Sequence, residues 1–295
     1  MNTLRRVGRD TGELTDEEMQ YIDTRVVETV RPLLVARRLF PVFNLNNAGI
    51  FKVKGYRESD MSPASISKYG KSQNRDRIEL EDFSVDVDVI SKDYKLNWRD
   101  VISSRNGGIP LETRSAENAG RQVAEEEDRL LISGEDDAIS WPADGIEGLA
   151  SATGRNQEIS AGAWPAFALT DVNDAIDELE TDGHYGPYGL ICRSPQMAAL
   201  RTVVGVTNAF YFELIQKLCT RGIFVSNNLY AGVDGDTDSA LVVELGADNF
   251  DMIIGRDLTT YSTQDEDMNI LGKVYEVVTP HIKRPASICE ITAIP

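Results

Sequence analysis

The sequence predicts an α+β fold that joins an elongated part to a compact α/β part, and three patterns support this prediction. Apolar residues recur at helical spacing over 16–30 and over 113–133. Apolar and polar residues alternate at strand spacing within 83–89. After residue 170, helical and extended patterns alternate in short segments, as they do in α/β domains. The 295 residues are 41% apolar and 26% charged, which is typical of globular chains.

The first helix is predicted over 16–30. Thr15 and Glu18 have the spacing of a capping box, in which each side chain bonds a backbone N–H near the helix start. Apolar side chains then repeat on one helical face: Met19, Ile22, Val26 and Val30. Pro32 lacks a backbone N–H, so it should kink this helix or begin another one. Residues 33–39 then continue as a short helix that carries two arginines, Arg37 and Arg38.

Two extended segments flank about 20 polar residues that have no apolar period. Phe51 and Val53 alternate with lysines in the first segment. In the second segment, valines and a phenylalanine are expected on one face: Phe83, Val85, Val87 and Val89. A structureless loop this long is uncommon inside a compact domain, so 55–80 is expected to reach out and contact another chain.

A second long helix is predicted over 113–133, after the break at Gly107 and Gly108. Its buried stripe is expected to hold four apolar residues: Ala116, Ala119, Val123 and Leu130. The acidic run Glu125–Asp128 is expected outside, on a solvated face or between subunits.

The rest of the chain reads as a loop followed by short alternating elements. Residues 145–165 look like a loop, and helices are expected from Thr170, after Ser194 and over 208–219. The expected strands cover 188–192, 222–226, 239–244, 251–254, 270–278 and 286–292. The last two strands are expected to return to the elongated part.

The strongly negative net charge argues against an outer surface that binds polyanions such as nucleic acids. Net charge is −18, and residues 1–80 hold 14 Lys and Arg against 11 Asp and Glu, or +3, which leaves −21 for the remainder. Lysine is scarcer than arginine, so a halophilic source is one hypothesis and an acidic mesophilic protein is the alternative. No apolar run approaches a membrane span, and the opening residues lack a signal-peptide core, so a cytoplasmic product without membrane contact is expected.

The chemistry-bearing residues predict no catalytic, cofactor-binding or metal-ligating site. The three cysteines, Cys192, Cys219 and Cys289, have no CxxC spacing, and the chain has only His184 and His281. The glycine-rich run 183–189 follows a helix and precedes a strand, the reverse of a phosphate cradle, so it is expected to be a plain connection. The acids of 234–238 depart from a calcium loop and read as a solvated turn. On chemistry alone, the chain reads as a structural protein and not as an enzyme.

A series of short motifs resembles the encapsulin family. The motifs are Leu14-Thr15 with Glu17, Ile22-Asp23 and Arg25, Ala36-Arg37-Arg38, Arg121 with Ala124-Glu125, Glu127-Asp128 and Gly134, Gly145-Ile146 with Gly148-Leu149, Gly186-Pro187-Tyr188, Arg221-Gly222, 240–243, and Gly255-Arg256-Asp257-Leu258. They follow the family order over roughly 14–290. The resemblance implies the tailed-phage capsid fold, called Hong Kong 97-like. In its terms the chain divides into an N-terminal arm and helix (1–48), an extended loop (49–82), a peripheral domain with a spine helix (83–139), an axial domain (140–264) and return strands to the peripheral domain (265–295).

By this resemblance the chain is a self-assembling icosahedral shell protein built from pentamers and hexamers. Asn44–Gly49 replaces the family's Gly-Pro turn, and the segments 55–80 and 150–164 are long, which favours the major capsid protein of a tailed, possibly haloarchaeal virus. Such a virion capsid would enclose double-stranded DNA and contact it non-specifically through arginines of 1–80. The alternative is an encapsulin nanocompartment that encloses a cargo enzyme, and a remote alternative is a soluble enzyme or binding module.

Overall fold

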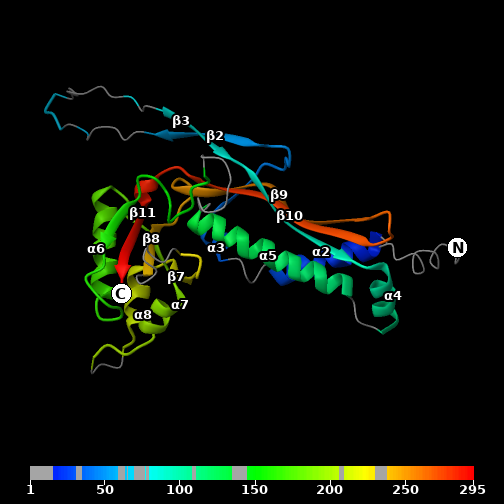
Figure 1. The fold of residues 1–295 in the computed structure, drawn as a ribbon. Helices are drawn as coiled ribbons and strands as arrows, with labels where there is room; N and C mark the ends of the chain where they lie inside the picture. Colours follow the sequence, from blue (N-terminus) through cyan, green and yellow to red (C-terminus); the bar gives the residue numbers. More distant parts are fainter. Residues whose placement is uncertain are drawn as a thin grey trace.

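The protein, described by a computed structural model, has an elongated part, a compact part and a projecting hairpin (Figure 1). The structure describes residues 16–30, 35–58, 64, 66–69, 77, 80–107, 111–134, 145–205, 209–229 and 238–295. Among these residues, no helix combines the length and the apolar character that a membrane crossing needs.

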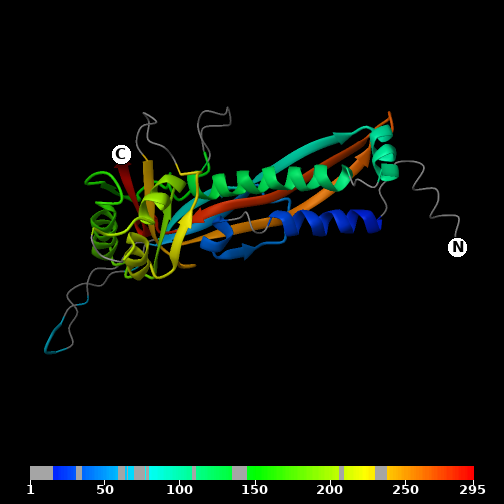
Figure 2. The same ribbon diagram turned by 90° about the horizontal axis from the view of Figure 1, so that it is seen from below.

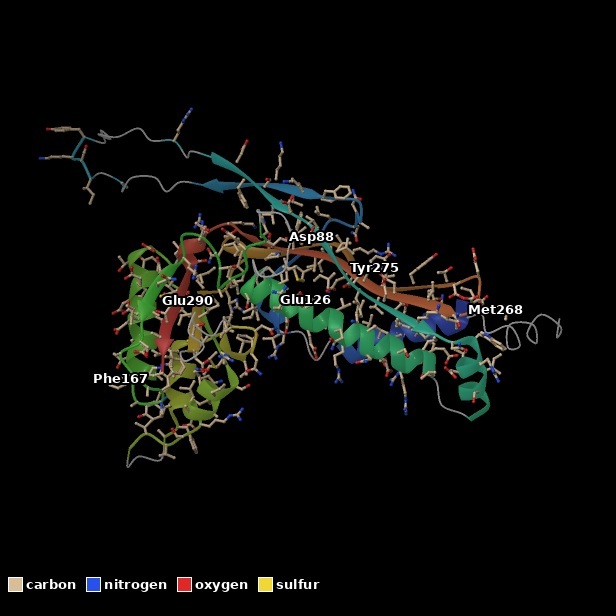
Figure 3. All side chains as sticks on the ribbon, in the orientation of Figure 1. Asp88, Glu126, Phe167, Met268, Tyr275 and Glu290 are labelled. Atoms are coloured by element: carbon tan, nitrogen blue, oxygen red, sulfur yellow. The ribbon has the colours of Figure 1, made fainter. Side chains whose placement is uncertain are left out.

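A four-stranded sheet runs along the elongated part. Its strand order is β1 (Val42–Asn44), β9 (Phe250–Gln264), β10 (Ile270–Ile282) and β4 (Asp88–Leu96). The two long strands β9 and β10 form an antiparallel hairpin, and β1 pairs in parallel with β9 as an edge strand. Met268, in the turn of that hairpin, lies at the end of the molecule away from Glu290 of the compact part (Figure 3).

Helices α2 (Asp16–Val30) and α5 (Leu111–Ser133) lie side by side along this sheet (Figure 2). Apolar side chains of both helices pack together against Val274 of the sheet: Ile22, Val26, Ala116, Ala119 and Val123. Leu130 is also buried. The predicted helices and the predicted apolar stripe of α5 are therefore confirmed.

The compact part is built on a five-stranded sheet. Its order is β5 (Asn156–Ile159), β11 (Ile288–Ile294), β8 (Asp238–Glu244), β6 (Tyr188–Cys192) and β7 (Gly222–Val225). Three helices complete this part: α6 (Ala168–Thr181), α7 (Ser194–Leu200) and α8 (Tyr211–Leu218). Every residue of β6 is buried, as expected for a short apolar strand in the interior of a sheet. The predicted alternation of helix and strand is confirmed.

The third sheet is the two-stranded hairpin of β2 (Lys52–Glu58) and β3 (Leu80–Asp86), which projects from the body (Figure 1). The expectation of one apolar face over 83–89 is wrong at Val89, which is 57% exposed. Val87 is buried and lies between β3 and β4, where the alternation of the two strands is interrupted. In β4 the side chain that packs against the core is therefore Ile90 and not Val89. Most of 55–80 beyond the paired strands lies outside the described residues, as do Thr15, Pro32 and 234–237.

Some elements differ from the sequence expectation. Strand β9 continues ten residues past the expected end at 254, because its distal half has one face on α2 and the other exposed and so carries no apolar run. Several elements were not expected: α4 (Trp98–Gly107), β1, β5, the 3₁₀ helix Pro285–Ser287 and most of β4. Strand β10 joins the elongated sheet as expected, but β11 pairs with β8 and β5 of the compact sheet, so the expected return of the last strand is wrong. The boundaries of the five-part division stay a prediction.

One hydrophobic core spans the junction of the two parts. It joins the end of α5, the short helix α3 (Ala36–Leu39) and strands of both sheets, through residues that include Leu39, Leu131, Ile132, Leu241, Phe250 and Met252. The segment that carries α3 and β1, residues 35–44, therefore lies where the elongated and compact parts meet. We call it the N-terminal segment below.

Candidate functional site

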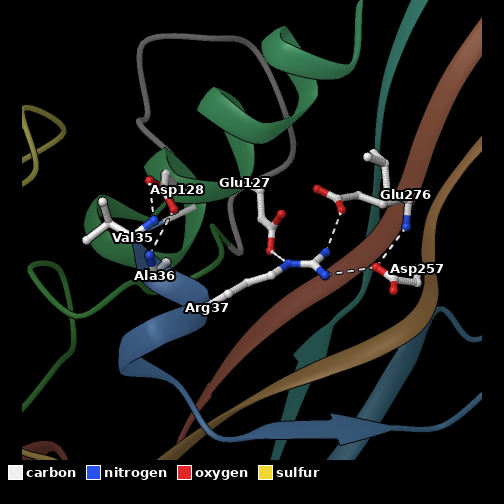
Figure 4. Close-up of polar contacts among 8 residues, drawn as sticks. Val35, Ala36, Arg37, Glu127, Asp128, Asp257 and Glu276 are labelled. Carbon is white, nitrogen blue, oxygen red and sulfur yellow. Dashed lines mark hydrogen bonds and ion pairs between the residues drawn. The ribbon is translucent and has the colours of Figure 1, made fainter. Parts of the chain in front are cut away.

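Charged side chains from four elements meet where the N-terminal segment packs against α5 (Figure 4). Glu127 and Asp128 of α5 are 0% and 7% exposed, whereas Glu125 and Glu126 are exposed. The expectation that this acidic run lies mostly outside or between subunits is therefore wrong for its last two members. Glu127 follows Val123 by four positions, so it shares the buried face of the helix. That spacing was visible in the sequence.

Asp128 caps the short helix α3 from a distance of more than ninety residues in the chain. Its Oδ1 accepts the backbone N–H of Ala36 at 2.9 Å, and its Oδ2 accepts that of Val35 at 3.1 Å. Val35, at the N-cap position, contributes no side-chain hydrogen bond of its own. Burial raises the pKa of Asp128, and these two N–H groups oppose that rise. The carboxylate thus takes the place that a local Ser or Asp side chain occupies in most helices.

Arg37 of α3 binds three acids at once. Its Nε contacts Glu127 Oε1 at 2.7 Å, its Nη2 contacts Glu276 Oε2 at 3.0 Å, and its Nη1 contacts Asp257 Oδ1 at 2.9 Å. Glu276 on β10 is 1% exposed, whereas the side chain of Asp257 on β9 is 67% exposed. One guanidinium therefore ties the N-terminal segment to α5 and to the long β9–β10 hairpin.

A β-bulge places two of these acids. Tyr275 is paired with Thr259, but Val277 is paired with Arg256, so two residues of β9, Asp257 and Leu258, lie opposite Glu276 alone. A bulge redirects side chains that a regular ladder would alternate. Sequence reasoning missed this part of the site, because a bulge leaves no mark in the apolar pattern of the strands.

The electrostatics of the cluster follow from its burial. Burial works to lower the pKa of Arg37, but its ion pairs with Glu127 and Glu276 outweigh that effect and raise the pKa. Burial raises the pKa of both Glu127 and Glu276. Among the described residues, the cluster therefore places three acids around one partly buried cation, Arg37.

The root of the projecting hairpin is a second ordered site. The ring of Phe83 on β3 stacks on His281 of β10, with ring centroids 5.2 Å apart, and His281 Nδ1 lies 2.7 Å from Asp251 Oδ1. A Cβ atom on Gly55 of β2 would lie 2.5 Å from His281 Nε2 and 2.6 Å from the Phe83 ring. Only glycine permits this close approach of the hairpin to β10.

A cavity of about 380 Å³ lies beside this root. It is lined by residues of the hairpin, of 145–147 and of β10, which include Lys52, Phe83, Asp86, Ile146, Glu147 and Pro280. Lys52 and Asp86 form an ion pair across the two hairpin strands at 3.0 Å. The hairpin therefore contacts the body mainly at its root.

The remaining sequence motifs have structural positions. The glycine-rich run 183–189 connects α6 to β6, as expected, and Glu244 holds it by accepting the N–H of Gly186 at 2.9 Å and contacting His184 Nδ1 at 2.6 Å. The three cysteines are buried, and burial raises the pKa of each thiol to about 12: Cys192, Cys219 and Cys289. Within the described residues, no group of three or more His, Cys, Asp or Glu side chains could hold a metal ion.

Comparisons with known proteins agree on one family. The model of the family described as "Encapsulating protein for peroxidase" matches residues 1–279. The type 1 encapsulin shell protein EncA of Myxococcus xanthus is 27% identical over 287 residues, which cover 97% of this chain and 96% of the relative. A diheme-cytochrome-encapsulin shell fusion protein of Kuenenia stuttgartiensis is 25% identical over 94% of this chain and 73% of its own length.

Solved structures show the same fold at low sequence identity. A virus-like particle from Pyrococcus furiosus matches with a TM-score of 0.69 and 17% identity, over 91% of this chain and 96% of that one. The capsid of Myoviridae Phage XM1 matches with a TM-score of 0.68 and 11% identity, over 88% and 90%. The predicted Hong Kong 97-like fold is confirmed.

Proposed function

Because this chain belongs to the encapsulin family, we propose that its copies assemble into a closed icosahedral shell that encloses a cargo enzyme. The observation that carries the proposal is the family match over residues 1–279. A relative named as a shell protein also aligns with nearly the whole of both chains. The proposed role is structural, without a catalytic step in the chain itself.

The viral capsid favoured by the sequence departures is the second candidate. The fold does not distinguish the two candidates, since the TM-scores to a virus-like particle and to a phage capsid are 0.69 and 0.68. The sequence comparisons favour the encapsulin alternative, because the family model and the relative from Myxococcus xanthus are encapsulins. The halophilic source and the cytoplasmic location stay predictions.

The projecting hairpin supports assembly with neighbouring copies. A two-stranded hairpin is marginally stable alone, and β2–β3 meets the body mainly at its root. Between β2 and β3, Ile66 and Tyr69 are exposed at 105% and 84%. We infer that residues 55–80 pack against an adjacent subunit, which would bury these side chains and offset the cost of ordering the segment.

The N-terminal segment supports a cargo-binding role. Strand β1 is the edge of its sheet, so the backbone groups on its outer side are available for another strand. Its two apolar side chains, Val42 and Phe43, are 48% and 52% exposed. We propose that an extended segment of the cargo adds to this edge and covers both side chains.

The names of the relatives suggest the class of cargo. One relative is a fusion of the shell with a diheme cytochrome, another is a fusion with a ferritin-like protein, and the family is described by its peroxidase. We therefore expect a redox or iron-handling enzyme inside this shell.

Shell formation is tested by expressing the chain alone and examining it by size-exclusion chromatography and negative-stain electron microscopy. Closed particles of uniform size support the proposal, and a stable monomer would refute it. Nuclease treatment followed by nucleic-acid quantification separates the two shells. Nuclease-protected double-stranded DNA would transfer the assignment to a viral capsid.

Two variants test the assigned surfaces. Deletion of residues 60–74 is expected to give folded subunits that cannot close a shell, and normal particles would count against the hairpin contact. Phe43→Asp is expected to leave shells intact but to remove the enzyme that copurifies with wild-type particles from the source cells. Phe51→Asp is the matched control, since Phe51 is 83% exposed and lies outside β1.

A further inference from the structure

We propose that Glu127 and Glu276 together bind one proton in the folded subunit, and that this proton holds the N-terminal segment onto α5 and the β9–β10 hairpin. Loss of the proton at higher pH would then loosen residues 35–44. The proposal stands on the geometry of the charged cluster and does not depend on shell formation.

The two carboxyl groups form a buried pair with an incomplete set of hydrogen bonds. Glu127 and Glu276 are 0% and 1% exposed, and each gives one oxygen to Arg37. The second oxygen of each, Glu127 Oε2 and Glu276 Oε1, is buried without a hydrogen-bond partner. Figure 4 shows these two oxygens on the sides of the carboxyl groups that face each other. As ionised carboxylates, both oxygens are acceptors, and a buried acceptor without a donor is costly. One proton between the two groups supplies the missing donor.

The cations around the pair are too few to neutralise both carboxylates. Arg37 is the one cation that contacts either glutamate among the described residues, and it also binds Asp257. The neighbouring Asp128 on α5 is occupied by two N–H groups of the N-terminal segment. Arg38 turns away and lies over the Phe224 ring, 5.5 Å from its centroid.

The other packed strand places no charge directly opposite the pair, and its nearest charged residues on that face, Asp88 and Lys92, are exposed. On β4, the residue opposite Glu276 is the apolar Ile90. The buried core of the cluster therefore holds two acids against one guanidinium, and a bound proton restores neutrality there.

The proton resides on Glu276. Glu127 keeps the shorter contact, 2.7 Å to Arg37 Nε, which favours its ionised form. Burial raises the pKa of Glu276 well above its usual value, and the nearby charge of Glu127 raises it further. At Glu127, burial raises the pKa, but the charge of Arg37 and its hydrogen bond oppose that rise. Glu276 then donates through Oε1 and accepts from Arg37 through Oε2.

The direction of the pH effect follows from these shifts. In the unfolded chain Glu276 loses its proton near its usual pKa of 4.5, but in the folded subunit it retains the proton to higher pH. The folded state therefore binds more protons, and stability falls as pH rises from about 4.5 through the raised pKa. Above it, two ionised carboxylates compete for Arg37, and α3 is the element that can move away.

The direct test is infrared difference spectroscopy on the full chain at pH 7. A protonated carboxylic acid has a carbonyl stretch distinct from that of a carboxylate. We expect this band in the wild-type protein, its loss in Glu276→Gln, and its retention in Asp257→Asn, which removes the exposed acid on the same Arg37. Absence of the band in the wild type, or its survival in the Glu276 variant, would overturn the proposal.

A second test measures the coupling of the proton to stability. Urea unfolding from pH 5 to pH 9 should show a folding equilibrium constant that falls by up to tenfold per pH unit for one released proton. In Glu276→Gln the amide keeps a donor at every pH, so this slope should decrease by up to one proton. Hydrogen exchange of the backbone amides of 35–44, corrected for intrinsic rates, should rise with pH in the wild type only. Equal slopes in the two proteins would refute the coupling. If Glu276→Gln does not fold, Glu127→Gln carries the same expectation, because its amide can donate to Glu276.

Discussion

Replacement of Asp128 by alanine should release the N-terminal segment from α5. The carboxylate is the acceptor for the backbone N–H groups of Val35 and Ala36, at 3.1 and 2.9 Å. Alanine would leave both donors without that acceptor. The N-terminus of the short helix α3 would then have no cap, because no local side chain provides one.

The magnitude follows from the two bonds and from the cost of burying the acid. A hydrogen bond to a charged group contributes about 1.5–3 kcal/mol, so two of them contribute roughly 3–6 kcal/mol. Burial of Asp128 opposes this gain, as the raised pKa of its carboxyl indicates. We expect Asp128→Ala to lower the free energy of unfolding by about 2–4 kcal/mol. Asp128→Asn keeps one acceptor oxygen and should lose roughly half as much.

The assay combines urea unfolding, followed by tryptophan fluorescence, with hydrogen exchange of the peptide that covers residues 35–40. Exchange of the Val35 and Ala36 amides should become faster in Asp128→Ala. Glu125→Ala is the matched control, because Glu125 is exposed on the same helix and should change stability by less than about 0.5 kcal/mol. A loss below about 1 kcal/mol with unchanged exchange at Val35 would show that the cap does not hold the segment.

Three further expectations address the core, the hairpin root and acid stability. Leu130→Ala should cost about 2–5 kcal/mol in urea unfolding, because Leu130 is 7% exposed on the buried stripe of α5, and a loss below about 1 kcal/mol would place it on another face. Gly55→Ala should cost about 1–3 kcal/mol and displace the hairpin, since the added Cβ would meet His281 and Phe83; wild-type thermal stability with normal shells would contradict this contact. Burial acts to raise the pKa of Asp251, but hydrogen bonds from His281 and a lysine outweigh it, so the pKa is lowered. Its contribution to stability is therefore present above about pH 3.8 and lost as pH falls below, and Asp251→Asn should flatten the acid limb of an unfolding curve; an unchanged limb would reject this assignment.

The charged cluster shows where sequence reasoning succeeds and where it ends. The position of Glu127 on the buried face of α5 follows from its spacing of four residues to Val123, so this part of the cluster is encoded locally in the sequence. Asp257 and Glu276 belong to strands whose register shifts at a bulge, and no local pattern gives that shift. Asp257 and Glu276 both bind Arg37, from which they are separated by more than two hundred residues in the chain.

The sequence by itself determined most helices and strands and the α+β class, and an ordered series of short motifs carried the resemblance that implies the Hong Kong 97-like fold. The helices and strands follow from local periodicity and local turn chemistry, which act over a few residues. Only the tertiary structure decided which sheet receives β11, which acids bind Arg37, and how Gly55 meets His281. Each of these depends on pairing between segments far apart in the chain, where register, bulges and close packing select partners that composition and spacing leave open.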